Sequence, residues 1–408
     1  MKRILLSLFM LSVALVNAQT DEYGYTTVEL SMGAGYENRV FFDLSENSIQ
    51  SHTANNWDVA FWRNGSFEFG SRINDAQNIE VYEASSNPAD WDAISISNIG
   101  SWGEPLYNPD LTENLGEGAF EQGSASYGWG EYNPGNHHVE GTVIFVLKYL
   151  DDESYVKFMI EDYFGGYTFK YAKWNGSSWD ATQTKTVANG SNNNYFNYFS
   201  FDTNDVVTNI EPEIGTWDLM FTRYWTFYNG ELMYRMSGVL QNPDLDIARA
   251  EETQATDAIS LPSESNFSKV ISTIGHSWKP AIGDSFDNVA YYIKQGDQIY
   301  RLYFIENGGS ANGNMFFKYK NVTDDLETDD FTNVEISVYP NPVVNQLNIS
   351  AKELIKEIKI YSLDGQLIHA TKTNLSQTNI NLSSLKAGVY IAQIVTESGV
   401  ATKKIVKK

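Results

Sequence analysis

Hydrophobic and polar residues alternate along much of this chain, which is the spacing of half-buried β-strands. In the stretches WDVAFW at Trp57–Trp62 and WDLMF at Trp217–Phe221, large apolar residues alternate with other residues. Two longer stretches, Val143–Asp162 and Val289–Asn307, each hold two apolar runs separated by a turn-rich break, which predicts a hairpin. We find no long stretch with a sustained helical period. The pattern therefore predicts an all-β protein.

Several sequence landmarks occur twice in the same order. They are a Phe-rich segment, the Trp-Asp phrase, an IG…SW element, a strand pair with Tyr-x-x-x-x-Ile-Glu, and a closing Phe-Lys-Tyr. Five landmarks in one order indicate a tandem duplication. We place copy one at residues 19–180, a polar, Asn-rich linker at 181–194, and copy two at 195–322. The expectation is two related β-rich domains in tandem.

The repeated Trp-Asp pairs, Trp57-Asp58 and Trp217-Asp218, allow two interpretations. Paired carboxylates are the groups that hydrolyse glycosides. A simpler interpretation is a buried tryptophan whose neighbouring aspartate faces solvent, a turn or a backbone donor. Because the duplication repeats the aromatic frame as faithfully as the acid, we favour the structural role.

The first residues indicate export. An apolar run, Ile4–Val16, follows Lys2 and Arg3, and a cut after Ala18 gives a secretory signal peptide over residues 1–18. No stretch reaches the roughly 20 apolar residues of a membrane-spanning helix. The chain contains 0 cysteines, which excludes disulfides, thiolate zinc sites and cysteine nucleophiles. We therefore expect an exported protein without a transmembrane segment.

The last part of the chain reads as a separate small unit. An acidic spacer, Thr323–Asp330, precedes residues 331–408, where alternating runs and turn signals predict an Ig-like antiparallel β-sandwich. This unit resembles the type A C-terminal sorting domain of type IX secretion cargo. The residues that carry the resemblance are Tyr339, Pro340, Asn341, Pro342, Gly388 and Tyr390, together with IYSLDGQLI and the basic tail. The resemblance implies a partner, the type IX secretion machinery, and a location outside the cell or on the outer surface of a Gram-negative bacterium.

Composition narrows the function further. With 28 basic and 52 acidic residues, the formal net charge is −24, and such a surface repels nucleic acid. The chain has no G-x-S-x-G elbow, no P-loop and no EF-hand pattern. We therefore expect a protein that is not an enzyme and has no catalytic residues.

The two copies resemble the HmuY-like family, β-rich proteins of which some capture haem. Copy one carries the resemblance in NWDVAFWR, SYGWGEYNPGNHHVEG, TVIFVLKY and SYVKFMIE, and copy two in TWDLMFTR and IYRLYFIE. Copy two lacks the Gly-Trp-Gly segment. The resemblance implies ligand binding, with haem or another flat aromatic ligand as the first candidate. Copy one would hold the site.

Three histidines are the candidate haem ligands, because haem iron takes axial His or Met ligands in an apolar pocket. His137 and His138 lie in a Gly/Asn/Pro loop beside Trp129, and His276 lies in the IG…SW element of copy two. Glu140 lies close to the first two in sequence but lacks the spacing of a known metal motif, so we predict no metal site. The alternative function is a structural or adhesive surface protein that binds polysaccharide or protein. A histidine in an apolar cleft favours the binder, and histidines exposed on a tip favour the adhesin.

Overall fold

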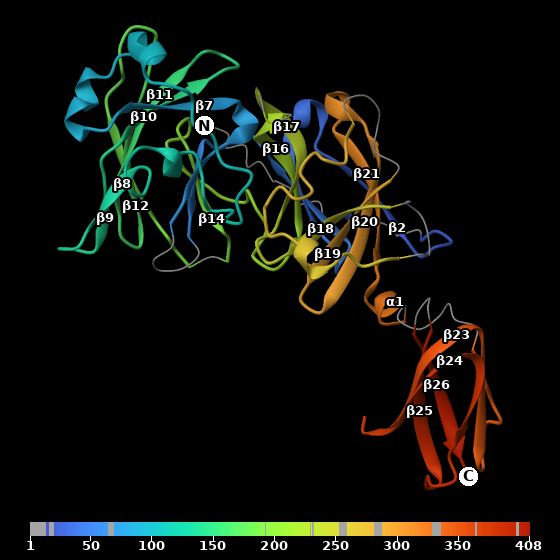
Figure 1. Ribbon diagram of the computed structural model, residues 1–408. Helices are drawn as coiled ribbons and strands as arrows, with labels where there is room; N and C mark the ends of the chain where they lie inside the picture. The colour runs from blue at the N-terminus through green and yellow to red at the C-terminus, as the bar shows by residue number, and fades with distance from the viewer. Residues whose placement is uncertain are drawn as a thin grey trace, which may run out of the picture. The chain divides into compact units, whose positions relative to one another are not determined.

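The computed structural model describes residues 14–15, 20–63, 69–191, 193–228, 230, 232–252, 259–280, 288–328, 336–363, 365–396 and 400–408. The chain divides into two compact units. The first comprises Met1–Asp257 and Pro262–Lys320, and the second comprises Ala258–Leu261 and Asn321–Lys408. Both consist of antiparallel sheets, so the all-β prediction is confirmed (Figure 1). Apart from Ala14–Leu15, the expected signal peptide lies outside the described residues.

The first unit contains two β-sandwiches. In sandwich one, a sheet with the order β13-β12-β11-β10-β7, joined by the hairpin β8-β9, faces a second sheet with the order β15-β14-β5-β6. Its strands are β5 (Val59–Trp62), β6 (Ser71–Ile73), β7 (Ile79–Ser85), β8 (Gly130–Asn133), β9 (His138–Gly141), β10 (Ile144–Tyr149), β11 (Tyr155–Tyr163), β12 (Gly166–Lys173), β13 (Gln183–Ala188), β14 (Phe196–Ser200) and β15 (Asp205–Val207).

Sandwich two is built in the same way. A sheet with the order β18-β19-β20-β21-β2 faces a sheet with the order β1-β4-β3-β16-β17. Its strands are β1 (Ala14–Leu15), β2 (Thr26–Ser31), β3 (Asn38–Asp43), β4 (Ser48–Thr53), β16 (Leu219–Tyr228), β17 (Leu232–Gln241), β18 (Asp246–Glu251), β19 (Val289–Gln295), β20 (Gln298–Asn307) and β21 (Asn314–Asn321).

The strand orders show that each sandwich contains strands from both halves of the sequence. Strand β5 pairs with β14 in sandwich one, and β3 pairs with β16 in sandwich two. If β2 to β7 are matched with β13 to β18, and β10 to β12 with β19 to β21, the two sandwiches have the same order. The repeat in the sequence thus corresponds to a repeat in topology, with the first strands exchanged.

The expected limits of the two copies therefore do not coincide with the limits of the sheets. Residues 181–194, expected to be a linker, include strand β13. This strand pairs with β12 along its whole length, from Gln183 to Ala188. Exposure alternates along β13, but Val187 is its one buried side chain, so the strand lacks the apolar pattern from which it could be predicted. Backbone hydrogen bonds to β12 hold this polar segment in the sheet.

Strand β5 illustrates how both faces of an inner sheet are buried. Val59 and Phe61 pack into the core of sandwich one, whereas Ala60 and Trp62 pack into a third core that lies between the sandwiches. Trp62 stacks there on Tyr195, with ring centroids 5.1 Å apart. Successive strand side chains point to opposite faces, so an apolar run without polar interruptions fits a strand covered on both sides.

The repeated Trp-Asp pairs connect the exchanged strands. Asp58 Oδ2 accepts a hydrogen bond from the Phe201 N–H at 2.6 Å, and Asp218 Oδ2 accepts one from the Leu44 N–H at 2.7 Å. Each donor follows a strand from the opposite half of the sequence. Burial raises the pKa of Asp218 to about 7 and raises that of Asp58 as well. The backbone-donor interpretation of the phrase thus describes both aspartates.

The second unit is the small antiparallel sandwich predicted from the last residues. Its central strand pairs with three others, and its core is aliphatic. Its strands are β22 (Ile336–Tyr339), β23 (Gln346–Ser362), β24 (Leu367–Asn381), β25 (Gly388–Val395) and β26 (Val400–Lys407). Of the expected acidic spacer, residues Thr323–Thr328 form the helix α1, and its last two residues lie outside the described residues. The Asn321 Oδ1 atom accepts the Thr323 N–H, and acidic residues occupy the first helical turn, which favours a helix N-terminus.

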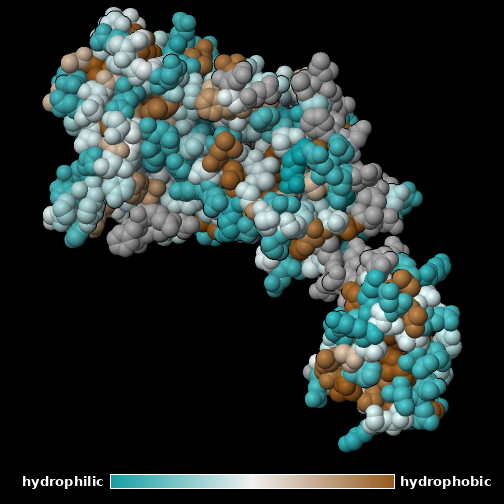
Figure 2. All heavy atoms as spheres, viewed as in Figure 1, coloured by the Kyte–Doolittle hydropathy of each residue, from teal (hydrophilic) through white to brown (hydrophobic). Residues whose placement is uncertain are grey.

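Short 3-10 turns complete the description: η1 (Ala34–Tyr36), η2 (Asp75–Gln77), η3 (Pro88–Ala93), η4 (Ile96–Ser101), η5 (Phe120–Gln122), η6 (Glu264–Asn266) and η7 (Gly309–Ala311). Figure 2 shows that hydrophilic residues dominate the visible face of the first unit, in agreement with the net charge of −24. None of the helices among the described residues is long and apolar enough to cross a membrane.

Candidate functional site

An aromatic groove lies at one end of sandwich one. Its volume is about 760 Å³, and its described wall contains the residues Arg63, Phe69, Tyr127, Tyr132, His137, Val139, Tyr163, Phe164, Gly165, Asn189 and Gly190. Five of these side chains are aromatic rings. Ligand sites for small organic molecules have volumes of about 300–1,000 Å³ and mainly apolar walls, so the groove has the size and the lining of such a site.

The Gly-Trp-Gly segment holds one wall of the groove in place. Trp129 is completely buried in the core of sandwich one. Gly128 has φ +76°, and a Cβ atom there would lie 2.3 Å from backbone atoms of Glu121. A Cβ atom on Gly130 would lie 2.6 Å from the Glu140 carbonyl oxygen. The segment needs glycine because the backbone passes so close to its neighbours.

The hairpin β8-β9 presents the two neighbouring histidines. Asn133 shapes its turn: the Gly135 N–H donates to the Asn133 side chain at 2.8 Å, and the His137 N–H donates to the Asn133 carbonyl at 2.9 Å. His137 adopts φ +63° in this turn. The side-chain amides of Asn136 and Asn133 donate to Glu140 and lower the pKa of its carboxyl group. Among the described residues, no group of three or more His, Asp or Glu side chains could hold a metal ion, and this includes groups that contain Glu140.

Both histidines are oriented through Nδ1. The Tyr132 hydroxyl lies 2.6 Å from His137 Nδ1, and His137 lines the groove. His138 Nδ1 lies 2.7 Å from Asp162 Oδ1, and its ring stacks on Phe164 with centroids 4.5 Å apart. Since Nδ1 is engaged in each ring, Nε2 is the nitrogen that would meet a ligand. A carboxylate on the far nitrogen is the usual support of a metal-binding histidine.

The third candidate ligand, His276, is not part of this groove. It belongs to sandwich two, where the neighbouring Gly275 pairs with Val239 of β17. Its Nδ1 lies 2.8 Å from the Tyr224 hydroxyl, and burial lowers the pKa of its imidazole. The structure therefore brings His137 and His138 together and leaves His276 in the other sandwich.

Sequence reasoning missed several residues of the groove. Phe69 and the pair Tyr163-Phe164 come from two separate segments, and nothing in their local pattern indicates a common wall. Arg63 could have been noticed, because the repeated phrase contains it: NWDVAFWR ends on Arg63 as TWDLMFTR ends on Arg223. Arg63 is only 9% exposed, and burial lowers the pKa of its guanidinium group.

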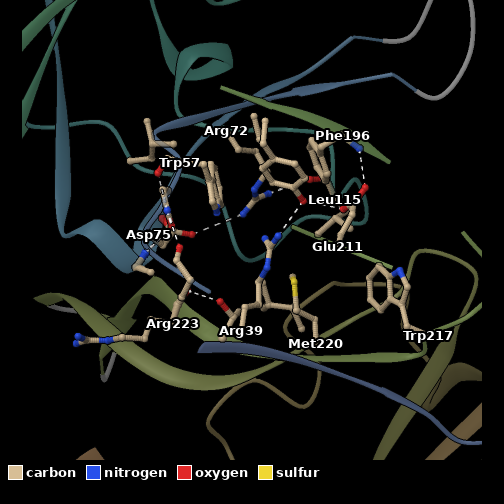
Figure 3. A pocket seen from close by; sticks show the side chains of 18 residues that line it. Arg39, Trp57, Arg72, Asp75, Leu115, Phe196, Glu211, Trp217, Met220 and Arg223 are labelled. Carbon is tan, nitrogen blue, oxygen red and sulfur yellow. Dashed lines mark hydrogen bonds and ion pairs between the residues drawn. The ribbon is translucent and has the colours of Figure 1, made fainter. Parts of the chain in front are cut away.

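A second cavity lies between the inner sheets of the two sandwiches, with a volume of about 40 Å³ (Figure 3). Charged side chains surround it. Arg39 donates to the Tyr198 hydroxyl at 3.0 Å, that hydroxyl donates to Glu211 at 2.7 Å, and Arg72 lies 4.0 Å from Asp75. Such a volume holds about two or three water molecules and no organic ligand. We assign this polar cluster to the packing of the two sandwiches.

The sorting-motif residues surround the ends of strands in the second unit. Asn341 bonds to β26 twice: its amide donates to the Lys404 carbonyl at 2.7 Å, and its carbonyl oxygen accepts the Val406 N–H at 2.8 Å. Gly388 begins β25, and the Tyr390 hydroxyl donates to the Lys386 carbonyl at 3.0 Å. Tyr339, at the end of β22, is exposed, and Pro340 and Pro342 follow it.

Comparison with known proteins defines the class of the second unit. Residues 337–408 match the family model described as "Secretion system C-terminal sorting domain". This unit is therefore a sorting domain of the type IX secretion system, and the chain is cargo of that system, exported to the cell surface or released.

The other comparisons concern the whole chain. No curated protein matches it. Among solved structures, it is similar to PorZ of Porphyromonas gingivalis, described as an essential bacterial surface component of the type IX secretion system. The similarity covers 74% of this chain and 46% of that chain, with 11% sequence identity and a TM-score of 0.16. The chain thus spans less than half the length of that protein.

Proposed function

We propose that this exported cargo protein is a non-enzymatic binder that holds a flat aromatic ligand in the groove of sandwich one, with haem as the first candidate. The observation that carries the proposal is the combination of five aromatic rings with His137 in a groove of about 760 Å³. The aromatic rings offer faces for stacking, and the histidine offers a directed nitrogen.

The residues of the groove fit haem chemically. Haem iron takes an axial histidine, and the porphyrin ring needs an apolar pocket. His137 lies in the groove wall as an exposed side chain, whereas His138 stacks on the wall residue Phe164, so His137 is the ring that would meet a bound ligand through Nε2. Haem iron would supply a coordinate bond to a histidine nitrogen. Tyr132 orients the imidazole of His137, and Asp162 orients that of His138.

A haemin titration of the purified full chain tests the proposal. We expect haemin binding to shift the Soret band in a saturable way. The affinity for haemin should fall at least about tenfold in the His137→Ala/His138→Ala variant, because the axial bond is lost. His276→Ala is the matched control, because His276 belongs to sandwich two and should leave the titration unchanged. An unshifted band, or the same band in all variants, would contradict iron ligation at this site.

One observation supports the alternative, an adhesive surface protein. The hairpin formed by β16 and β17 exposes large apolar side chains, Phe227 at 54%, Leu232 at 60% and Tyr234 at 54%. Exposed rings of this kind stack on sugars or contact proteins. Binding of the wild-type chain to immobilised polysaccharides, compared with a Phe227→Ala/Tyr234→Ala variant, tests this function. Retention that depends on these rings, without any binding of haemin, would favour the adhesin.

A further inference from the structure

The turn of the hairpin β8-β9 lies beside the turn that joins β11 to β12. Strand β9 pairs with β11 through Val139↔Tyr163, and the next position along this register sets His138 opposite Phe164. Val139 and Tyr163 point into the core of sandwich one. Because successive side chains of a strand point to opposite faces, the rings of His138 and Phe164 lie on the outward face, as cross-strand neighbours.

These two rings form a parallel stack. Their centroids lie 4.5 Å apart, and their planes differ by only 2°. His138 Nδ1 lies 2.7 Å from Asp162 Oδ1, and this contact fixes the plane of the imidazole. Asp162 precedes Phe164 by two residues, so its side chain reaches the same outward face of β11. The imidazole therefore covers one face of the Phe164 ring and supports that ring in a defined orientation.

The other face of the Phe164 ring is turned to the aromatic groove. Phe164 belongs to the described wall of the groove, whereas His138 does not, so the groove meets Phe164 on the side that the imidazole leaves uncovered. At 62% exposure, Phe164 is also the most exposed of the five aromatic side chains in that wall. A flat ring placed on this surface gains a stacking contact and removes apolar area from water, and neither gain requires an enclosed pocket.

We infer that the ligand of the groove stacks on the open face of Phe164, as the third layer above His138, and that His138 is a positioning residue and not an iron ligand. The inference rests on the proposed function, since it specifies how the same site recognises its ligand. It also defines the chemical class of the ligand, a planar aromatic ring system that binds with or without a metal, because stacking needs no iron.

His137 has a different role from its neighbour. It is exposed in the groove wall, and its Nδ1 lies 2.6 Å from the Tyr132 hydroxyl. Its Nε2 is therefore the nitrogen that would bind iron when the planar ligand is haem. The two adjacent histidines would thus divide the task, since one supports the stacking surface and the other coordinates a metal.

Two probes test the inference: haemin and metal-free protoporphyrin IX. Both are titrated into the purified full chain, and binding is followed by quenching of tryptophan fluorescence. We expect the wild type to bind both. Phe164→Ala should weaken the binding of both at least about fivefold, because the stacking surface is lost. His137→Ala should weaken haemin at least about tenfold but the metal-free porphyrin less than about twofold, because only haem iron uses the histidine nitrogen.

Variants of His138 separate stacking from iron ligation. His138→Ala should weaken both probes at least about threefold, because the Phe164 ring loses its support. His138→Phe should bring both back to within about twofold of the wild type, since a phenyl ring keeps the stack and has no nitrogen for iron. Phe227→Ala is the matched control: Phe227 is an exposed ring on β16 of sandwich two, so its loss should change neither affinity.

Three results would overturn the inference while the proposed function stands. They are binding of the metal-free porphyrin that is unchanged in Phe164→Ala, binding of haemin that is as weak in His138→Phe as in His138→Ala, and a wild type that binds haemin alone. A wild type that binds neither probe would overturn both proposals. If Phe164→Ala does not fold, the comparison of His138→Ala with His138→Phe still decides the matter.

Discussion

The bonds made by Asp58 lead to a quantitative prediction about stability. Replacing Asp58 with alanine removes the acceptor of the Phe201 N–H, at 2.6 Å, and of the Tyr149 hydroxyl, at 2.7 Å. Both donors belong to buried residues. Gln77, which also donates to Asp58, keeps its second acceptor, the Trp57 carbonyl.

The size of the effect follows from these partners. Each buried donor left without an acceptor costs about 1–3 kcal/mol, so two such donors give about 2–6 kcal/mol. Removing a buried carboxyl group, whose pKa is raised by burial, offsets part of this cost. We therefore expect Asp58→Ala to lower the free energy of unfolding by about 3 kcal/mol.

Urea unfolding followed by tryptophan fluorescence measures this change. All 10 tryptophans of the chain lie between Trp57 and Trp278, so the signal reports on the first unit. The control is Asp202→Ala: this side chain is 90% exposed and pairs with Lys173, so its loss should cost about 0–1 kcal/mol. An Asp58→Ala variant within about 0.5 kcal/mol of the wild type would refute the reasoning.

Two further predictions concern the support of the groove. Burial raises the pKa of Glu121 to about 7, so its protonated form contributes stability below pH 4.5 that is lost as the pH rises through about 7. Glu121→Gln should therefore remove about 2 kcal/mol of the decline in unfolding free energy between pH 5 and 8, measured by urea titrations at each pH, and an unchanged decline would contradict this. Gly128→Ala should destabilise the first unit by at least about 2 kcal/mol in the same assay, because the new Cβ atom meets the Glu121 backbone. Gly176→Ala, also at positive φ but with no atom within 4 Å, should cost only about 1 kcal/mol, and equal losses would show that the close contact is not the cause.

The fold class and the repeat could be predicted because both are properties of local pattern. Alternation in Trp57–Trp62 predicts a strand, and β5 occupies Val59–Trp62. The exchange of strands between the halves could not be predicted, because β5 has the same side-chain pattern whether its neighbour is β3 or β14. The hydrogen bond that the buried Asp58 carboxylate accepts from the Phe201 N–H accompanies the pairing of β5 with β14 in the structure.

The candidate site could be predicted only in part. The loop with His137 and His138 stands out by composition, and the structure places His137 in an aromatic groove. His276, the third candidate ligand, does not line the groove. Residue type alone does not show which sandwich a histidine belongs to. The other walls come from β11, the loop after β13 and the end of β5, which are distant in sequence.

The sequence by itself determined the all-β class, the duplicated landmarks and the sorting domain, because each depends on residues within a short window. Only the tertiary structure decided which strands share a sheet, and therefore which loop lies beside each of the two repeated arginines. Arg63 and Arg223 end nearly identical phrases, yet one lines a groove and the other lies under Tyr36. The physical reason is that a side chain's environment is set by loops that approach it through space, here the loop after β2 in one sandwich and the loop after β13 in the other.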